Sequence, residues 1–151
     1  MFKNIAIILG EFHKKEVTEM LNEARKVAKE NKLKIGVRYI GSWADYSGYG
    51  EANRQIIYAL YKAGVNLTTE KVSFVREIED FGEAHVIAEK LEKKQIEYQI
   101  IIIHLTADLY LKYLEPGKYH IGHLFWETDK LPNWWAWYCN RLDEMWTGSE
   151  T

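Results

Sequence analysis

The sequence predicts an α/β protein with a single Rossmann-like, doubly wound, mostly parallel sheet and helices on both of its faces. Three observations lead to this prediction. Apolar runs of strand length alternate along the chain with segments of helical periodicity. The isoleucine run at 100–103 has no polar face, so a strand there should be covered on both sides. The 151 residues, 47% of them hydrophobic, can build one full core, and we expect one domain over 1–151.

The first half of the chain predicts two strand-helix pairs. Residues 5–9 read as a buried strand, and 15–31 as an amphipathic helix because its apolar residues fall on one face. Residues 34–40 read as a second strand. A helix over about 50–63 follows, with Gly64 placed for a left-handed C-cap.

The second half continues the alternation of strand and helix. A strand within 65–74 precedes a charged amphipathic helix at 82–94, because apolar and charged residues there recur at helical spacing. The remaining predicted elements are a strand at 98–103, a short helix at 106–113, a strand at 119–125, a helix at 133–141 and a strand at 144–146.

Composition narrows the possible partners and compartment. The 20 basic and 22 acidic residues are interleaved and leave a net charge of -2, which argues against nucleic-acid binding. The single cysteine cannot form an internal disulfide, and the N-terminus lacks the order of a signal peptide, so we expect a cytoplasmic protein. The longest apolar run is far shorter than the roughly 20 residues that span a bilayer, so any membrane contact should be peripheral.

A glycine-containing loop follows the strand at 34–40. Gly48 and Gly50 precede a helix, and free amides at a helix N-terminus can hold an anion such as a diphosphate. The spacing is not G-x-G-x-x-G and no Walker lysine follows, which disfavours dinucleotide and P-loop sites. The loop could equally be a connection that needs positive φ at both glycines.

His104 ends the isoleucine strand, where ligands of parallel sheets bind. A neutral imidazole there could donate a hydrogen bond to a sugar hydroxyl or accept a proton from one. Asp108 could orient His104 or cap the short helix, whereas Thr106 is better placed as the cap. A structural role for His104 is the alternative.

The pattern of His120, His123 and Glu127 resembles a metal motif, but we expect no metal site. Residues three apart on a strand point to opposite faces, so the two imidazoles should not converge.

Three tryptophans, Trp134, Trp135 and Trp137, crowd the helix at 133–141, which Pro132 should start or cap. Neighbours on a helix point about 100° apart, so at least one indole should be exposed while two pack under the sheet. An exposed indole can stack on a sugar, lie at a membrane interface or meet another domain.

The string W-E-T-D-x-L-P, followed by N-x-x-D-E-x-W-x-x-S, spans about thirty residues of this region. Together with the segment GSWADYSGYGEANRQIIYALYKAGV at 41–65, it resembles the N-terminal half of family-4-type glycosyltransferases. These enzymes have the GT-B arrangement of two facing Rossmann-like domains. The chain contains no Asp-x-Asp motif of the kind expected in metal-dependent GT-A enzymes.

The resemblance implies that residues 35–151 form the acceptor-side domain of an enzyme that transfers a hexose from a nucleotide sugar to a carbohydrate or lipid-linked hydroxyl acceptor. It implies no cofactor beyond the donor substrate, and the position of His104 at the end of the isoleucine strand makes it the candidate catalytic residue. The site residues that the resemblance implies near the donor phosphates are Gly48, Tyr49, Gly50, Asn53 and Arg54, and those that it implies along the acceptor side of the cleft are Trp126, Glu127, Thr128 and Asp129. We add Asp108 and Trp134 to the acceptor side from their positions near His104 and on the tryptophan-rich helix.

The donor-binding domain of such an enzyme is not in this sequence, so we expect the chain alone to be weakly active or inactive unless a partner chain or domain completes the cleft. We also expect the changes His104→Ala and Gly50→Val to weaken cleft ligands while the fold stays intact.

Two alternatives remain. The chain could be a non-catalytic carbohydrate-binding or protein-interaction module. Residues 1–34, an extra βα unit, also resemble the opening of lumazine synthase, with Phe12 at the aromatic position that stacks on the heterocycle. That resemblance implies a lumazine-synthase-like enzyme.

Overall fold

The computed structural model describes residues 22–23, 26, 35–77, 82–126 and 130–147. The chain divides into two compact units, Met1–Ile35 and Gly36–Thr151. The account below concerns the second unit. The predicted strand at 5–9 and Phe12 lie outside the described residues, as does most of the predicted helix at 15–31.

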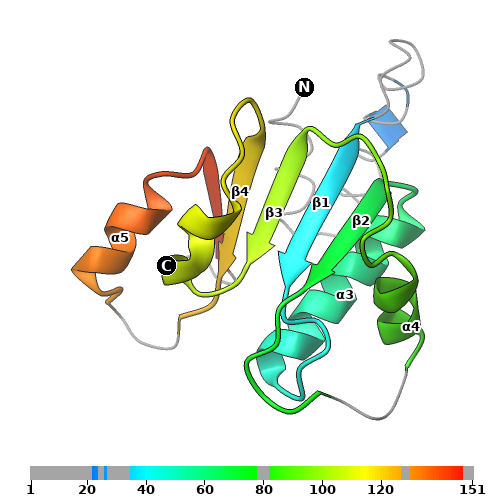
Figure 1. Ribbon diagram of the computed structural model, residues 1–151, viewed down its shortest axis with the longest axis horizontal. Helices are drawn as coiled ribbons and strands as arrows, with labels where there is room; N and C mark the ends of the chain where they lie inside the picture. The colour runs from blue at the N-terminus through cyan, green and yellow to red at the C-terminus, as the bar shows by residue number, and fades with distance from the viewer. Residues whose placement is uncertain (1–21, 24–25, 27–34, 78–81, 127–129, 148–151) are drawn as a thin grey trace. The chain divides into compact units, whose positions relative to one another are not determined.

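A five-stranded, all-parallel sheet forms the centre of the second unit (Figure 1). Its strand order is β2-β1-β3-β4-β5. This arrangement, with the helices described below, confirms the predicted α/β, Rossmann-like fold. The strands are β1 (Gly36–Gly41), β2 (Asn66–Lys71), β3 (Ile100–His104), β4 (Tyr119–Leu124) and β5 (Glu144–Thr147).

Four helical segments accompany the described strands: α3 (Gly48–Lys62), α4 (Glu83–Lys90), the 3₁₀ helix η1 (Ala107–Tyr113) and α5 (Asn133–Cys139). The helix α3 begins two residues earlier than predicted because the Ser47 hydroxyl caps it by accepting a hydrogen bond from the Gly50 amide at 3.0 Å. Gly64 follows with a left-handed φ of 79°, as predicted. Pro132 is the N-cap residue of α5, which also agrees with the prediction.

The strand predicted within 65–74 ends at Lys71. After β2 the chain turns to run along the loop that follows β1, where the Phe74 amide donates to the Asp45 carboxylate at 3.0 Å. The Tyr46 amide in turn donates to the Arg76 carbonyl at 2.8 Å. These contacts satisfy backbone groups without continuing the sheet ladder.

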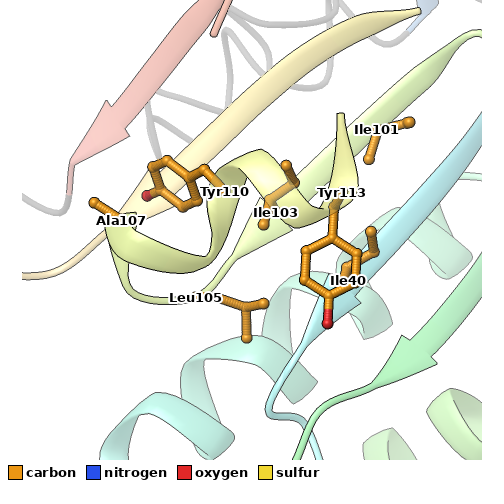
Figure 2. Close-up of a cluster of buried hydrophobic side chains, with 7 residues drawn as sticks. All are labelled: Ile40, Ile101, Ile103, Leu105, Ala107, Tyr110 and Tyr113. Carbon is orange, nitrogen blue, oxygen red and sulfur yellow. The ribbon is translucent and has the colours of Figure 1, made fainter. Parts of the chain in front are cut away.

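Both faces of the isoleucine strand are buried. Ile101 and Ile103 pack with residues of η1 in the cluster drawn in Figure 2, together with Ile40 of β1. Ile100 and Ile102 alternate with them and are equally buried. The helix α3 lies on the side of the sheet away from η1 (Figure 1). Coverage on two sides explains why this strand carries no polar face.

The direction in which successive strands are added to the sheet changes between β1 and β3. The strand β2 lies on one side of β1, whereas β3, β4 and β5 follow on the other. In open α/β sheets such a reversal separates the connections at the carboxyl ends of the two strands and forms a crevice where ligands bind. Gly41, the last residue of β1, is paired in register with His104, the last residue of β3. The predicted site residue His104 therefore lies at the switch point of the sheet. Among the described residues, no helix is both long and apolar enough to cross a membrane.

Candidate functional site at the carboxyl edge of the sheet

A cluster of rings surrounds His104 at the switch point. The imidazole of His123, on β4, stacks on that of His104 with centroids 4.0 Å apart and planes 23° apart. The rings of Tyr49 and Phe125 lie 5.5 and 5.6 Å from His104. Below them, the hydroxyl oxygen of Tyr39 on β1 lies 2.5 Å from Nδ1 of His104. We call these five residues the switch-point cluster.

Burial controls the charge of the switch-point cluster. It lowers the pKa of His104 well below the ordinary value, to which the neighbouring His123 also contributes. Burial likewise lowers the pKa of His123 to about 4, and it raises the pKa of Tyr39 far above the usual range. Near neutral pH both imidazoles are therefore uncharged, and Tyr39 keeps its proton. The cluster can form hydrogen bonds, but it offers no positive charge to a phosphate.

Tyr49 joins the first turn of α3 to the end of β4. Its hydroxyl donates to the Phe125 carbonyl at 3.0 Å and accepts from the Phe125 amide at 2.9 Å. The ring of Tyr49 packs edge-on against that of Phe125. The structure thus places this predicted phosphate-loop residue in the switch-point cluster, where it holds two elements together.

The glycines of the predicted loop behave differently from expectation. Neither Gly48 nor Gly50 has positive φ, since both are in α3, so the alternative of a connection with positive φ at both glycines is wrong. A Cβ atom on Gly50 would lie 2.1 Å from the Asp45 carbonyl oxygen, whereas one on Gly48 would meet nothing within 4 Å. Gly50→Val is therefore expected to disturb the fold, and Gly50 is required for close packing of the loop on the helix.

Arg54 is buried and holds the loop after β1 in place. Its guanidinium donates to the carbonyls of Trp43 and Asp45 at 2.8 and 3.1 Å, and to the carboxylate of Glu51 at 2.8 Å. These bonds occupy the group that was predicted to face donor phosphates.

Asn53 is buried too, with its amide donating to the Tyr49 carbonyl at 2.8 Å. Its Oδ1 packs so tightly against Gly41 that a Cβ atom there would lie 1.7 Å away.

A cavity of about 810 Å³ opens beside this loop, between the N-terminal ends of α3 and α4. Gly48 and Arg54 line it, whereas the other predicted phosphate-loop residues do not. Its lining includes the carboxylates of Glu51 and Glu83, which disfavour an anionic ligand. The residues around the cavity are Tyr46, Ser47, Gly48, Glu51, Arg54, Gln55, Tyr58, Gly82, Glu83, Ala84 and His85.

Asp108 is exposed on η1. The described hydrogen-bond partner of Nδ1 of His104 is the hydroxyl of Tyr39, and Nε2 has no partner among the described residues, so the predicted orienting role of Asp108 is not what the structure has. Thr106 does occupy the N-cap position of η1, but its side chain makes no capping hydrogen bond, contrary to prediction.

The segment after β4 carries the acceptor-side candidates. Trp126 is 41% exposed, and its indole N–H donates to the Lys130 carbonyl at 3.0 Å. Its ring lies 4.8 Å from that of Trp135. Glu127, Thr128 and Asp129 lie outside the described residues.

The tryptophan helix α5 is more exposed than predicted. Trp134 and Trp137 are 58% and 50% exposed, and no residue of α5 is buried. Trp135, which is half-buried and packs against the core cluster under η1, is the one indole of the three that is covered. The expectation that two of them pack is wrong, because this helix of seven residues lies at the edge of the unit rather than under the sheet.

His120 and His123 have different surroundings, as predicted. Nε2 of His120 accepts a hydrogen bond from the Glu115 amide at 2.9 Å, and its Nδ1 lies 3.5 Å from the Asp143 carboxylate. His123 instead stacks on His104. The two imidazoles serve separate parts of the fold.

Sequence reasoning missed Tyr39 and Phe125, and it considered His123 only as a metal ligand. Tyr39 lies on the predicted strand at 34–40, one residue from its predicted carboxyl end and two from the observed end of β1 at Gly41. A tyrosine near the carboxyl end of a buried strand was a usable signal, but the sequence does not show which strand lies beside it.

Comparison with protein-family models, curated proteins and solved structures finds no match for this chain.

Proposed function

We propose that this protein is the acceptor-side domain of a GT-B glycosyltransferase that transfers a hexose from a nucleotide sugar to a hydroxyl acceptor. The observation that carries the proposal is the position of the glycosyltransferase-like motif. Its first residue, Trp126, follows directly on Phe125, a member of the switch-point cluster at the carboxyl edge of the sheet. Motif and cluster thus meet where parallel sheets bind ligands.

The charges favour an acceptor role for this domain over a donor role. A diphosphate leaving group needs cationic or amide donors. The guanidinium of Arg54 is engaged by the loop and by Glu51, and the two imidazoles of the switch-point cluster are uncharged near neutral pH. Groups that grip the donor diphosphate would come from a second Rossmann-like domain, in the same chain or in a partner.

Aromatic side chains next to the cluster suit a carbohydrate. The indole of Trp126 is partly exposed and is held by a hydrogen bond to the backbone, which limits its freedom. A sugar ring can stack on such a face while its hydroxyls exchange hydrogen bonds with polar groups nearby.

Saturation-transfer NMR of the chain with a panel of nucleotide sugars and simple methyl glycosides tests this proposal. We expect transfer to glycosides, and a loss of that transfer on Trp126→Ala. The matched control is Trp137→Ala, which removes an exposed indole whose described ring contacts are with Tyr138 and Arg141. Transfer to no member of the panel would contradict the proposal.

A second candidate is a non-catalytic interaction module, and the exposure of Trp134 and Trp137 favours it. Exposed indoles on one short helix are typical of surfaces that bind another molecule. This candidate predicts concentration-dependent association, or binding to a partner, that is lost in the double variant Trp134→Ala/Trp137→Ala and is indifferent to Trp126→Ala.

A further inference from the structure

The contact between Tyr39 and His104 can be made in two ways. Either the phenol donates to Nδ1 of the imidazole, or the phenol oxygen accepts from an N–H at that position. The two arrangements place the single proton of the neutral ring on different nitrogens. They therefore give His104 different chemistry at Nε2.

Counting unpaired groups separates the two arrangements. Nε2 of His104 is buried and has no hydrogen-bond partner among the described residues. If Tyr39 accepted the bond, its own proton and the lone pair of Nε2 would both be left unpaired. If Tyr39 donates, only the N–H at Nε2 is left. Unpaired buried polar groups cost free energy, so donation by Tyr39 is favoured.

Burial acts in the same direction. It raises the pKa of Tyr39, which therefore retains a proton to donate, and it lowers the pKa of His104, which therefore holds one proton rather than two. Burial also keeps the nearby His123 uncharged near neutral pH, so His123 places no positive charge beside His104.

Other polar atoms at the end of β1 also lack partners among the described residues. They are Oγ of Ser42, which follows Gly41, and Oδ1 of Asn53, which packs on Gly41. Gly41 is the register partner of His104. Buried polar atoms without partners among the described residues therefore occur near the carboxyl ends of both β1 and β3, the two strands that flank the switch point.

We propose that Tyr39 is a positioning residue that fixes the proton of His104 on Nε2, so that the switch point holds a neutral N–H donor there rather than a base. In this tautomer Nε2 has no lone pair with which to accept a proton. Of the two roles that the sequence left open for His104, the structure assigns hydrogen-bond donation rather than general-base catalysis. That this donor would serve a sugar hydroxyl rests on the proposed glycosyltransferase function.

Long-range ¹H–¹⁵N NMR of the imidazole nitrogens tests the proposal in the ligand-free chain near neutral pH. The expected spectrum has His104 in one tautomer, with the proton on Nε2 and a hydrogen-bonded, unprotonated Nδ1. In Tyr39→Phe we expect the single tautomer to be lost, with signals from both forms. The matched control, Tyr110→Phe, removes a buried hydroxyl that bonds the His123 carbonyl and should leave the His104 tautomer unchanged.

A proton on Nδ1 of His104 in the unmodified chain would overturn the proposal, and so would a Tyr39→Phe spectrum that keeps the Nε2–H form alone. If Tyr39→Phe does not fold, as judged by circular dichroism, the spectrum of the unmodified chain decides by itself. Titration with methyl α-glucoside separates the two proposals: failure to bind speaks against the function, while the tautomer stands or falls on the ligand-free spectra.

Discussion

Burial gives the two stacked histidines an effect on stability that depends on pH. Unfolding exposes them, and in the unfolded chain each takes up a proton near the ordinary pKa of about 6.5. In the folded chain the pKa of His123 is about 4 and that of His104 lies well below its usual value. The folded state thus binds fewer protons in this window. The contribution of the two neutral imidazoles to the free energy of unfolding is complete above about pH 6.5 and is lost as pH falls toward 4.

Replacing His123 with phenylalanine should therefore flatten the pH dependence of stability. Phenylalanine keeps an aromatic ring against His104 but removes one titrating group. We expect the slope of unfolding free energy between pH 6 and pH 4.5 to decrease by up to about 1.4 kcal/mol per pH unit. Urea unfolding at several pH values measures this. An unchanged slope would mean that His123 titrates normally in the folded protein.

Gly50 and Gly48 provide a matched pair of substitutions two residues apart on α3. Gly50→Ala drives a methyl group against the Asp45 carbonyl and should lower the free energy of unfolding by about 1–3 kcal/mol. Gly48→Ala meets open space and should change it by no more than about 0.5 kcal/mol. Chemical denaturation of both variants measures the difference, and equal effects would show that Gly50 is not confined by the loop.

At the scale of elements, the junction between β1 and α3 depends on Arg54. Arg54→Met keeps much of the apolar stem but leaves the Trp43 and Asp45 carbonyls without this donor. We expect a loss of about 2 kcal/mol in unfolding free energy. Gln55→Met, at an exposed position on the same helix, is the control and should have little effect. If both variants unfold alike, Arg54 does not anchor the loop.

The kind and order of the elements could be predicted because they depend on local periodicity. The isoleucine strand and the amphipathic helix α3 follow directly from patterns of apolar residues. Where β2 ends could not be predicted in this way. That boundary depends on hydrogen bonds from Phe74 and Tyr46 across the loop after β1, which no local pattern reveals.

The candidate site was predictable in position but not in its internal contacts. His104 could be placed because a buried parallel strand must end at the ligand-binding edge. Its partnership with Tyr39 depends on β1 lying beside β3, which is a property of strand order. The same limit applies to Arg54. The sequence places a cation near a glycine loop, whereas only the fold shows that backbone carbonyls already occupy it.

At the scale of the whole molecule, the proposed ligand site lies at one edge of the sheet, and an exposed aromatic surface lies beside it. The switch-point cluster joins β1, β3, the first turn of α3 and the end of β4. Trp126 continues from it toward α5, whose outer indoles are exposed. A hydroxyl-bearing ligand at the cluster and a second domain or partner near α5 would together complete a cleft.

The most direct test is a titration of the ¹⁵N-labelled chain with simple methyl glycosides, followed by chemical-shift perturbation of assigned amides and imidazoles. We predict the largest shifts at Tyr49, His104, His123 and Phe125, with smaller shifts at Trp126. Shifts confined to the outer face of α5, or no shifts with any glycoside, would contradict the assignment of the switch point as the acceptor site.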